Sequence, residues 1–281
     1  MEDNGTWSMV MLLVGKKRLG AQWVYKIKYN SDGSVKRYKA RMVTVWTGLA
    51  VAGVKNWELR RMDDLIIFGN DSAVRKYALD IISEAGLLRA RPVSFPMEQN
   101  HRLGSSTSPL LCDVERFLHS VGHLLYLSFT CPDLSYAIQV LSQFLHEPRQ
   151  DHWQAALHVV KYLKGCPSQR ILLGLDSDLH LTSWYDFDWA SCPLTRRSVS
   201  GWIVFFGSSP VSWKTKKQVI VSRSSTEAKY SSMAFLTYGT IQMSHVSTTE
   251  QIADRFTKSL RRKQFKFLLR KLGIRELHAP S

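Results

Sequence analysis

The segment CPDLSYAIQVLSQFLHEPRQDHWQAALHVVKYLKG (residues 131–165) contains two helical patterns separated by a proline. In each pattern, apolar residues recur at the i, i+3, i+4, i+7 spacing that aligns them on one helix face. The first set is Leu134, Ala137, Ile138 and Leu141, and the second is Trp153, Ala156, Leu157 and Val160. We expect Asp133 to cap the first helix and Pro148 to end it. Asp151 should cap the second helix, and Gly165 should end it.

The sequence before these helices predicts strands and one further helix. WVYKIKYNSDGSVKRYKARMV (23–43) alternates around a turn with an Asp-Gly dipeptide, which is typical of a β-hairpin. DDLIIFGND (63–71) predicts a short buried strand that ends in a turn. AVRKYALDIISEAGLL (73–88) predicts a helix with three residues close to one face. These are Tyr77, Ile81 and Ile82.

Domain boundaries follow the changes in pattern along the chain. A loop rich in proline, serine and glycine (93–109) precedes the helices, and strand-like runs begin near residue 171. We therefore expect three parts, residues 1–95, 96–170 and 171–281. The strand-like runs of the last part are 171–175, 179–189, 201–207, 210–213 and 218–222, and a helix is expected at 225–236.

The last helical pattern, RRKQFKFLLRKLGIR (261–275), has an apolar face surrounded by seven basic residues. Such a helix suits two situations, contact with RNA, DNA or a membrane surface, and packing back on its own domain. The pattern alone leaves both open.

The charge balance favours a polyanionic partner. The chain has 281 residues, with 38 Lys+Arg against 23 Asp+Glu and a net charge of +15, so nucleic acid is the first expectation and an anionic membrane surface the second. Four widely spaced cysteines without a C-x-x-C pair are typical of reduced thiols. Because no apolar run reaches the roughly 18 residues of a membrane span, we expect an intracellular protein of cytoplasm or nucleus.

Several stretches of the chain resemble, in order, the Pol polyprotein of copia-type retrotransposons. They include WVYKIKYNSDGSVKRYKARMV, DDLIIFGND, SVGHLLYLSFTCPDLSYAIQVLSQFLHEPRQDHWQAALHVVKYLKG, YDFDWASCPLTRRSVSGW, SWKTKKQVIVSRSSTEAKY and HVSTTEQIADRFTKSL. The resemblance implies an α/β (α+β) chain. Its parts would be a fragment of a reverse-transcriptase palm, connecting helices, and an incomplete ribonuclease H-like mixed sheet with helices.

The same resemblance implies internal deletions. In the family, a long palm and fingers region with the first metal-binding aspartate separates YKARMV from the aspartate pair, whereas only residues 44–62 do so here. Asp63 and Asp64 would then be a vestige of a polymerase metal site. Two divalent ions need carboxylates from separate strands, and the other strand is missing, so we expect no polymerase activity.

The ribonuclease H centre of the family uses four carboxylates to hold Mg²⁺ or Mn²⁺. By resemblance, Asp186 is the strand aspartate, with Asp188 on the same strand face, and Asp254 is the C-terminal one. The helix motif Glu-Ala-Glu-Tyr of the family has become Glu227-Ala228-Lys229-Tyr230, and the aspartate that should follow it has no counterpart. Because positions two apart on a helix point about 200° apart, Glu227 cannot replace the residue at 229. Instead, we expect Lys229 to pair with Asp186.

The basic residues match the family better than the acidic ones do. By resemblance, they follow the side that binds an RNA–DNA hybrid, where lysine and arginine contact phosphates without sequence preference. They are Arg196, Arg197, Lys214, Lys216, Lys217 and Arg223. The interleaved tryptophans are Trp184, Trp189, Trp202 and Trp213, and core packing is the better interpretation for most of them.

Two weaker signals involve histidines. Cys112, His119 and His123 suggest a zinc site because i, i+4 histidines share a helix face, but no fourth ligand is evident and a structural role is favoured. His245 lies near the C-terminal aspartate in sequence, where a phosphate contact and an ordinary surface role are both open.

Together these patterns predict a degenerate copia-type Pol fragment without catalysis. One alternative is a nucleic-acid-binding module that retains weak affinity for RNA–DNA hybrids. Another is a residual ribonuclease H that uses Asp186, Glu227 and Asp254. Mg²⁺ or Mn²⁺ would belong to the ancestral enzyme, and this chain would hold the ions, if at all, at Asp186, Asp254, Asp63 and Asp64. We expect neither a small-molecule substrate nor a membrane partner.

Overall fold

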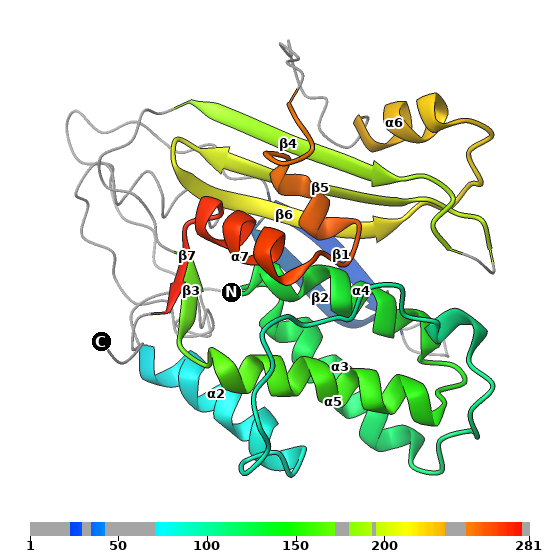
Figure 1. Cartoon of the computed structure of the whole chain (residues 1–281), viewed down its shortest axis with the longest axis vertical. Helices are drawn as coiled ribbons and strands as arrows, with labels where there is room; N and C mark the ends of the chain where they lie inside the picture. Colours follow the sequence, from blue (N-terminus) through cyan, green and yellow to red (C-terminus); the bar gives the residue numbers. More distant parts are fainter. Residues whose placement is uncertain are drawn as a thin grey trace.

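The computed structural model describes residues 71–171, 180–192, 195–233 and 246–276, and the backbone of two N-terminal strands. These parts combine helices with antiparallel strands, so the predicted mixed α/β class is confirmed (Figure 1). The two N-terminal strands, β1 (Trp23–Tyr29) and β2 (Val35–Met42), pair as the hairpin pattern predicts. Asp63, Asp64 and the strand predicted at 63–71 lie outside the described residues, apart from the first residue of the next helix.

Four helices form one layer of the molecule (Figure 1). They are α2 (Asp71–Glu84), α3 (Val114–Leu127), α4 (Ser135–Leu141) and α5 (Gln150–Gly165). The apolar set predicted for the first helix of the 131–165 segment is at most 1% exposed, which confirms that stripe. On α5 the buried stripe is Ala156, Val159, Val160 and Leu163, so Leu157 lies beside the stripe rather than in it.

Both predicted aspartate caps are wrong. Asp133 is buried, and its carboxylate accepts a hydrogen bond of 2.7 Å from the Tyr162 hydroxyl instead of capping α4. Asp151 lies one residue inside α5 and accepts a hydrogen bond from Ser106, while Arg149 is the cap residue. The Arg149 amide donates to Nδ1 of His152, which is buried two residues inside the helix. A buried imidazole therefore serves the helix start that the sequence pattern assigned to a carboxylate.

The second layer is a three-stranded antiparallel sheet in the order β4-β5-β6. Its strands are β4 (Leu181–Asp188), β5 (Val199–Phe206) and β6 (Ser209–Lys217). Two short strands, β3 (Gln169–Ile171) and β7 (Ile274–Glu276), pair separately. All strand pairs in the described parts are antiparallel, so the parallel strand of a mixed sheet is not among them.

The prediction of a strand at 218–222 is wrong. The run forms a loop between β6 and helix α6 (Ser225–Met233), in which Val219 and Ile220 are 69% and 73% exposed while Gln218 and Ser222 are buried. A strand needs a partner for its backbone. The register of β6 with β5 ends at Lys217, and one further hydrogen bond of 2.8 Å, from the Gln218 amide to the Ser198 carbonyl, closes the pairing. The sequence-based prediction relied on the apolar composition of this run, which does not reveal whether a partner strand is present.

The 3₁₀-helix η5 (Ile252–Phe256) and helix α7 (Arg262–Lys271) lie between the sheet and the helical layer (Figure 1). Phe265 and Leu268 of α7 are buried in the same core as α2 to α5, whereas Phe256 and Leu272 belong to the core under the sheet. The C-terminal helix therefore packs back on the molecule, the second of the two situations that its sequence allowed. No helix in the described parts is long and apolar enough to cross a membrane.

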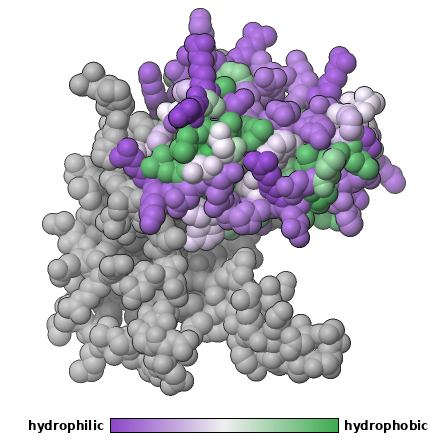
Figure 2. Space-filling view, turned by 90° about the horizontal axis from the view of Figure 1, so that it is seen from below, coloured by the Kyte–Doolittle hydropathy of each residue, from purple (hydrophilic) through white to green (hydrophobic). Residues whose placement is uncertain are grey.

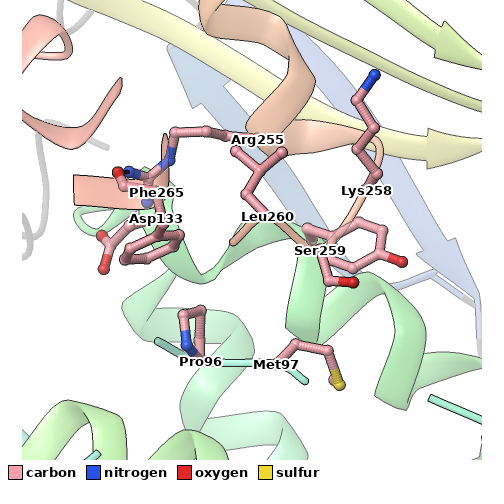
Figure 3. A pocket seen from close by; sticks show the side chains of 9 residues that line it. Pro96, Met97, Asp133, Arg255, Lys258, Ser259, Leu260 and Phe265 are labelled. Atoms are coloured by element: carbon pink, nitrogen blue, oxygen red, sulfur yellow. Dashed lines mark hydrogen bonds between the residues drawn. The ribbon is translucent and has the colours of Figure 1, made fainter. Parts of the chain in front are cut away.

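A buried arginine connects the two layers at a small recess (Figure 3). Arg255 of η5 is 4% exposed, donates a hydrogen bond of 2.9 Å to the Phe265 carbonyl, and places its guanidinium 3.9 Å from the centre of the Phe265 ring. Burial raises the pKa of the nearby Asp133 carboxyl, and the charge of Arg255 opposes that shift. The contact fixes the position of η5, which carries Asp254.

Candidate active site

Asp186 of β4 faces the covered side of the sheet. Its cross-strand partner is Gly201, which in turn pairs with Thr215 of β6, so these three residues point to the same face. A Cβ added to Gly201 would lie 2.4 Å from Cβ of Phe256 and 2.9 Å from Cγ2 of Thr257. The missing side chain at 201 therefore lets η5 approach the sheet closely, directly beside Asp186.

This close approach brings a second carboxylate and an ammonium group to Asp186. Asp254 of η5 is 2% exposed, and Nζ of Lys258 lies 3.1 Å from its Oδ2 and 3.7 Å from Oδ2 of Asp186. The Thr257 hydroxyl donates a hydrogen bond to the same Asp186 oxygen. Lys258 thus forms ion pairs with two buried or half-buried carboxylates, and the Thr257 hydroxyl fixes the position of one of them.

Asp188 completes what we call the carboxylate cluster, Asp186, Asp188 and Asp254. It lies two residues after Asp186 and shares its strand face, as the sequence predicts. Burial raises the pKa of the Asp188 carboxyl, Lys258 lowers it, and Asp186 raises it further. The three acids therefore interact electrostatically around one lysine.

The pKa values in the cluster follow from burial and from this crowding of charges. Burial, followed by the neighbouring Asp186 carboxylate, raises the pKa of Asp254 to about 6, although Lys258 opposes the shift. Burial alone would lower the pKa of the Lys258 ammonium, but Asp186 and Asp254 outweigh it, and the pKa is raised. At neutral pH the cluster therefore holds a charged lysine beside Asp254, whose carboxyl loses its proton near pH 6.

Glu227 does not join the carboxylate cluster. Its carboxylate accepts a hydrogen bond of 2.7 Å from the Arg223 amide, and its own amide donates to the Ser224 hydroxyl. Reciprocal bonds of this kind stabilise the start of α6, because the first amides of a helix have no partner within it. Glu227 therefore supports its own helix and lines a separate hollow with Lys216 and Ile220.

The expected pairing of Lys229 with Asp186 is wrong, because Lys258 makes that salt bridge and Lys229 is exposed. Helix α6 contacts Asp186 through another residue, Ser232, whose hydroxyl donates a hydrogen bond of 3.1 Å to the Asp186 backbone carbonyl. The short Ser232 side chain lets α6 pack against β4, and it supplies no charge.

The residues present do not fit a pair of divalent ions. Such a pair needs carboxylates on several sides, whereas the cluster offers acids only from β4 and η5. Position 229 is a lysine, and residues 231–245 contain no acidic residue. One buried atom, Oδ2 of Asp254, accepts no hydrogen bond of good geometry, but the Lys258 ammonium already lies at ion-pair distance from it. No catalytic step through a metal can be derived from this arrangement.

The predicted nucleic-acid-binding residues do not surround the carboxylate cluster. Strand alternation places Lys214 and Lys216 on the face of β6 opposite Thr215, and therefore opposite Asp186. Lys217 shares the face of Asp186 but donates to Gln143 and Cys192 at 2.8 Å each. The remaining three predicted nucleic-acid-binding residues are exposed and lie on the loops that precede β5 and α6. They are Arg196, Arg197 and Arg223.

The predicted core role of the tryptophans holds for two of them. Trp184 and Trp213 pack against the core under the sheet, and the Trp213 indole also donates to the Ser128 carbonyl. Trp189 is 46% exposed and donates to Ser222. His245 lies outside the described residues.

Sequence reasoning missed Thr257 and Lys258, although both stand in the quoted stretch HVSTTEQIADRFTKSL. The available signal was spacing, since a lysine four residues after an aspartate can return to it across one helical turn. The shared approach to Asp186 could not be read from spacing, because it depends on the contact between η5 and Gly201.

The site thus combines a strand acid with a second acid from a neighbouring 3₁₀-helix, on a framework of helices and antiparallel strands. The chain is 34% identical over 258 residues to the retrovirus-related Pol polyprotein from transposon RE2 of Arabidopsis thaliana, covering 71% of this chain and 18% of that protein. It is 41% identical over 160 residues to the Pol polyprotein from transposon RE1 of the same plant, covering 57% and 11%. Secreted RxLR effector protein 161 of Plasmopara viticola is 38% identical over 119 residues, or 42% of this chain and 84% of that protein. No protein-family model matches the chain, and no solved structure matches it significantly.

The chain is therefore a homologue of retrovirus-related Pol polyproteins from copia-type transposons. It spans less than a fifth of the length of the Pol polyproteins from RE2 and RE1. The alignment to RE2 runs over 258 residues but covers only 71% of this chain, so RE2 has residues within the aligned region that this chain lacks. That difference agrees with the internal deletion inferred from the sequence.

Proposed function

We propose that this chain is a folded, catalytically inactive derivative of a copia-type Pol polyprotein. The observation that carries the proposal is the composition of the carboxylate cluster, in which Asp186 and Asp254 share Lys258 and receive no acid from α6. An ancestral ribonuclease H would use Mg²⁺ or Mn²⁺ to direct water at a phosphodiester, and that chemistry needs more carboxylates than converge here. The positions that should supply the others are Lys229 and a stretch without acids.

The test is cleavage of an end-labelled RNA–DNA hybrid by the purified chain, with Mg²⁺ and with Mn²⁺ in separate reactions. We expect the wild-type chain and Asp186→Asn to give the same background product. An active ribonuclease H in the same buffers verifies the substrate. Metal-dependent product that exceeds that of Asp186→Asn would contradict the proposal and favour the residual ribonuclease H.

Weak binding of nucleic acid is a second candidate function, supported by the placement of two lysines. Lys214 and Lys216 are both exposed and point to the same face of β6, about 6.8 Å apart along the strand. Lysines in such a row meet successive phosphates of a nucleic-acid strand without reading its sequence. This binding would be independent of the carboxylate cluster, because that cluster lies on the other face of the sheet.

Salt dependence distinguishes this binding from nonspecific adhesion. Each phosphate contact adds about 0.9 to the slope of log affinity against log salt for a duplex. We expect Lys214→Gln with Lys216→Gln to reduce that slope by roughly one to two in a fluorescence-anisotropy titration with an RNA–DNA hybrid. Replacing Lys263 and Lys266 of α7 by glutamine removes the same charge from another exposed surface and is the matched control. Equal slopes for the β6 variant and the wild-type chain would exclude this face.

A further inference from the structure

Two histidines and a glutamate converge at one end of the contact between α2 and α3. Glu84 is the last residue of α2, and His119 and His123 are one turn apart on α3. Tyr77, two turns before Glu84, stacks edge-on against His123 and against Tyr126. Tyr77 lies near Tyr126 and Glu84 lies near His119, so residue numbers rise along α2 where they fall along α3. The two helices therefore run antiparallel, and Glu84 lies beside the histidine pair.

The ligand atoms of these residues are close together. Oε2 of Glu84 lies 3.2 Å from Nδ1 of His123 and 4.0 Å from Nδ1 of His119. The two imidazole rings are 4.1 Å apart between centroids, and the three ligand atoms all lie within 4.8 Å of one another. We call Glu84, His119 and His123 the α2–α3 cluster, and it is the one group of three metal-ligand side chains at such spacing in the described parts.

We propose that the α2–α3 cluster binds a divalent transition metal ion of the zinc type. Neutral imidazole nitrogens and a carboxylate oxygen are ligands that Zn²⁺, Cu²⁺ and Ni²⁺ accept. Bonds of about 2.0–2.2 Å place neighbouring tetrahedral ligands about 3.3–3.6 Å apart. The Glu84–His123 separation is close to this value, and the Glu84–His119 separation needs a shift of about half an ångström in exposed side chains.

The surroundings favour a stable but solvent-open site. The His123 side chain is 26% exposed and is ordered by Tyr77, whereas His119 and Glu84 are 67% and 53% exposed and adapt easily. In the proposed site one partly buried ligand fixes the position, two exposed ligands complete it, and the fourth place is left to a water molecule. The bound ion would join the end of α2 to α3, two helices that otherwise share few contacts.

Cys112 is not part of this site. Of the three zinc ligands suggested by the sequence, the two histidines are kept and Cys112 is replaced by Glu84. Cys112 precedes α3 and is exposed, and the third ligand is the carboxylate of Glu84 from a different helix. The i, i+4 spacing on α3 identified the histidine pair from the sequence. The third ligand, Glu84, is brought to the pair by the packing of α2 on α3 and could not be found from spacing.

The test is calorimetric titration of the full chain with Zn²⁺, after removal of any histidine tag. We expect one ion per chain, with the affinity reduced at least about tenfold by His119→Ala, by His123→Ala and by Glu84→Gln, because each removes one of three ligands. His146→Ala and Cys112→Ser are the matched controls, since both side chains are exposed and lie outside the cluster. The controls should bind as the wild-type chain does.

A second measurement covers the possibility that one variant folds poorly. Zn²⁺ should raise the urea midpoint of the wild-type chain, because a ligand that binds only the folded state stabilises it. The midpoint of Glu84→Gln, which keeps the size of an exposed side chain, should not respond. Zinc binding that survives the His119→Ala, His123→Ala double change, that is lost with Cys112→Ser, or that is absent from the wild-type chain would overturn the proposal.

Discussion

Gly201 of β5 and Phe256 of η5 approach so closely that a Cβ on Gly201 would lie 2.4 Å from the Cβ of Phe256. The backbone of Phe256 would lie 3.0 Å away, so the clash cannot be relieved by a side-chain rotation alone. This contact sets the distance between the sheet and η5. It therefore also sets the distance between Asp186 and Asp254, which sit on those two elements.

The variant Gly201→Ala should be destabilised by about 1–3 kcal/mol, because it overpacks a contact between two backbones. Urea unfolding followed by tryptophan fluorescence measures the change. Gly122→Ala on α3 is the matched control, because a Cβ there meets no atom within 4 Å. Alanine should stabilise that helix by up to about 1 kcal/mol relative to glycine. Equal effects of the two changes would mean that the approach of η5 to the sheet does not matter for folding.

The raised pKa of Asp254, about 6, predicts a pH dependence of stability. An unfolded aspartate has a pKa near 3.9, so between these values the folded chain binds more protons than the unfolded chain. The contribution of Asp254 to stability is therefore complete below about pH 4 and is lost as the pH rises through 6. Asp254→Asn cannot titrate and should lack this loss.

The measurement compares urea midpoints of the wild-type chain and Asp254→Asn from pH 4 to 7 in buffer with a metal chelator. The asparagine variant should gain stability relative to the wild-type chain across this range. Asp80→Asn removes an exposed carboxylate of α2 away from the cluster and serves as the control. A constant difference between Asp254→Asn and the wild-type chain would show that burial does not perturb Asp254.

The buried Arg255 contacts Phe265 between the sheet and the helical layer, and this contact should contribute to stability. Arg255→Met keeps the apolar stem but removes a charged hydrogen bond to Phe265 and leaves buried Asp133 without its neighbouring cation. We expect a loss of about 2 kcal/mol or more, since hydrogen bonds from charged groups contribute about 1.5–3 kcal/mol. Arg262→Met, exposed on α7, should change the free energy of unfolding by less than about 0.5 kcal/mol.

A double change tests the electrostatic part of this prediction. If Asp133 depends on Arg255, then Asp133→Asn in the Arg255→Met background should cost less than Asp133→Asn alone. Additive losses would assign the effect to the Phe265 contact and not to the charge.

The sequence was a good guide where periodicity determines structure and a poor one where contacts between distant segments do. The α4 stripe, helix α2 and the β1–β2 pairing all follow from local spacing, and the structure confirms them. The roles of Asp133, Lys258 and Glu84 depend on Tyr162, Asp186 and His123, which lie far from them along the chain. No periodicity reports such contacts, and a single sequence without its relatives gives no covariation from which to infer them.

The last prediction concerns the loop at 218–222, whose apolar residues Val219, Ile220 and Val221 are unexpectedly exposed. Ile220 is 73% exposed and Ile203 of β5 is fully buried, although both stand in apolar runs. Ile220→Thr should therefore change the free energy of unfolding by less than about 0.5 kcal/mol, whereas Ile203→Ala should cost about 2–5 kcal/mol. Exposed apolar side chains also occur on the helical side of the molecule, where Figure 2 shows apolar groups among hydrophilic ones.

Both changes are measured by urea unfolding, and the fluorescence of an added hydrophobic dye is measured in the absence of urea. Ile220→Thr should lower the dye signal of the folded chain because it removes exposed apolar surface. Leu125→Gln, another exposed apolar position on α3, should lower it to a similar extent. If Ile220→Thr instead destabilised the chain as strongly as Ile203→Ala, the loop would have to be packed in solution, against another segment of the chain or a second copy of it.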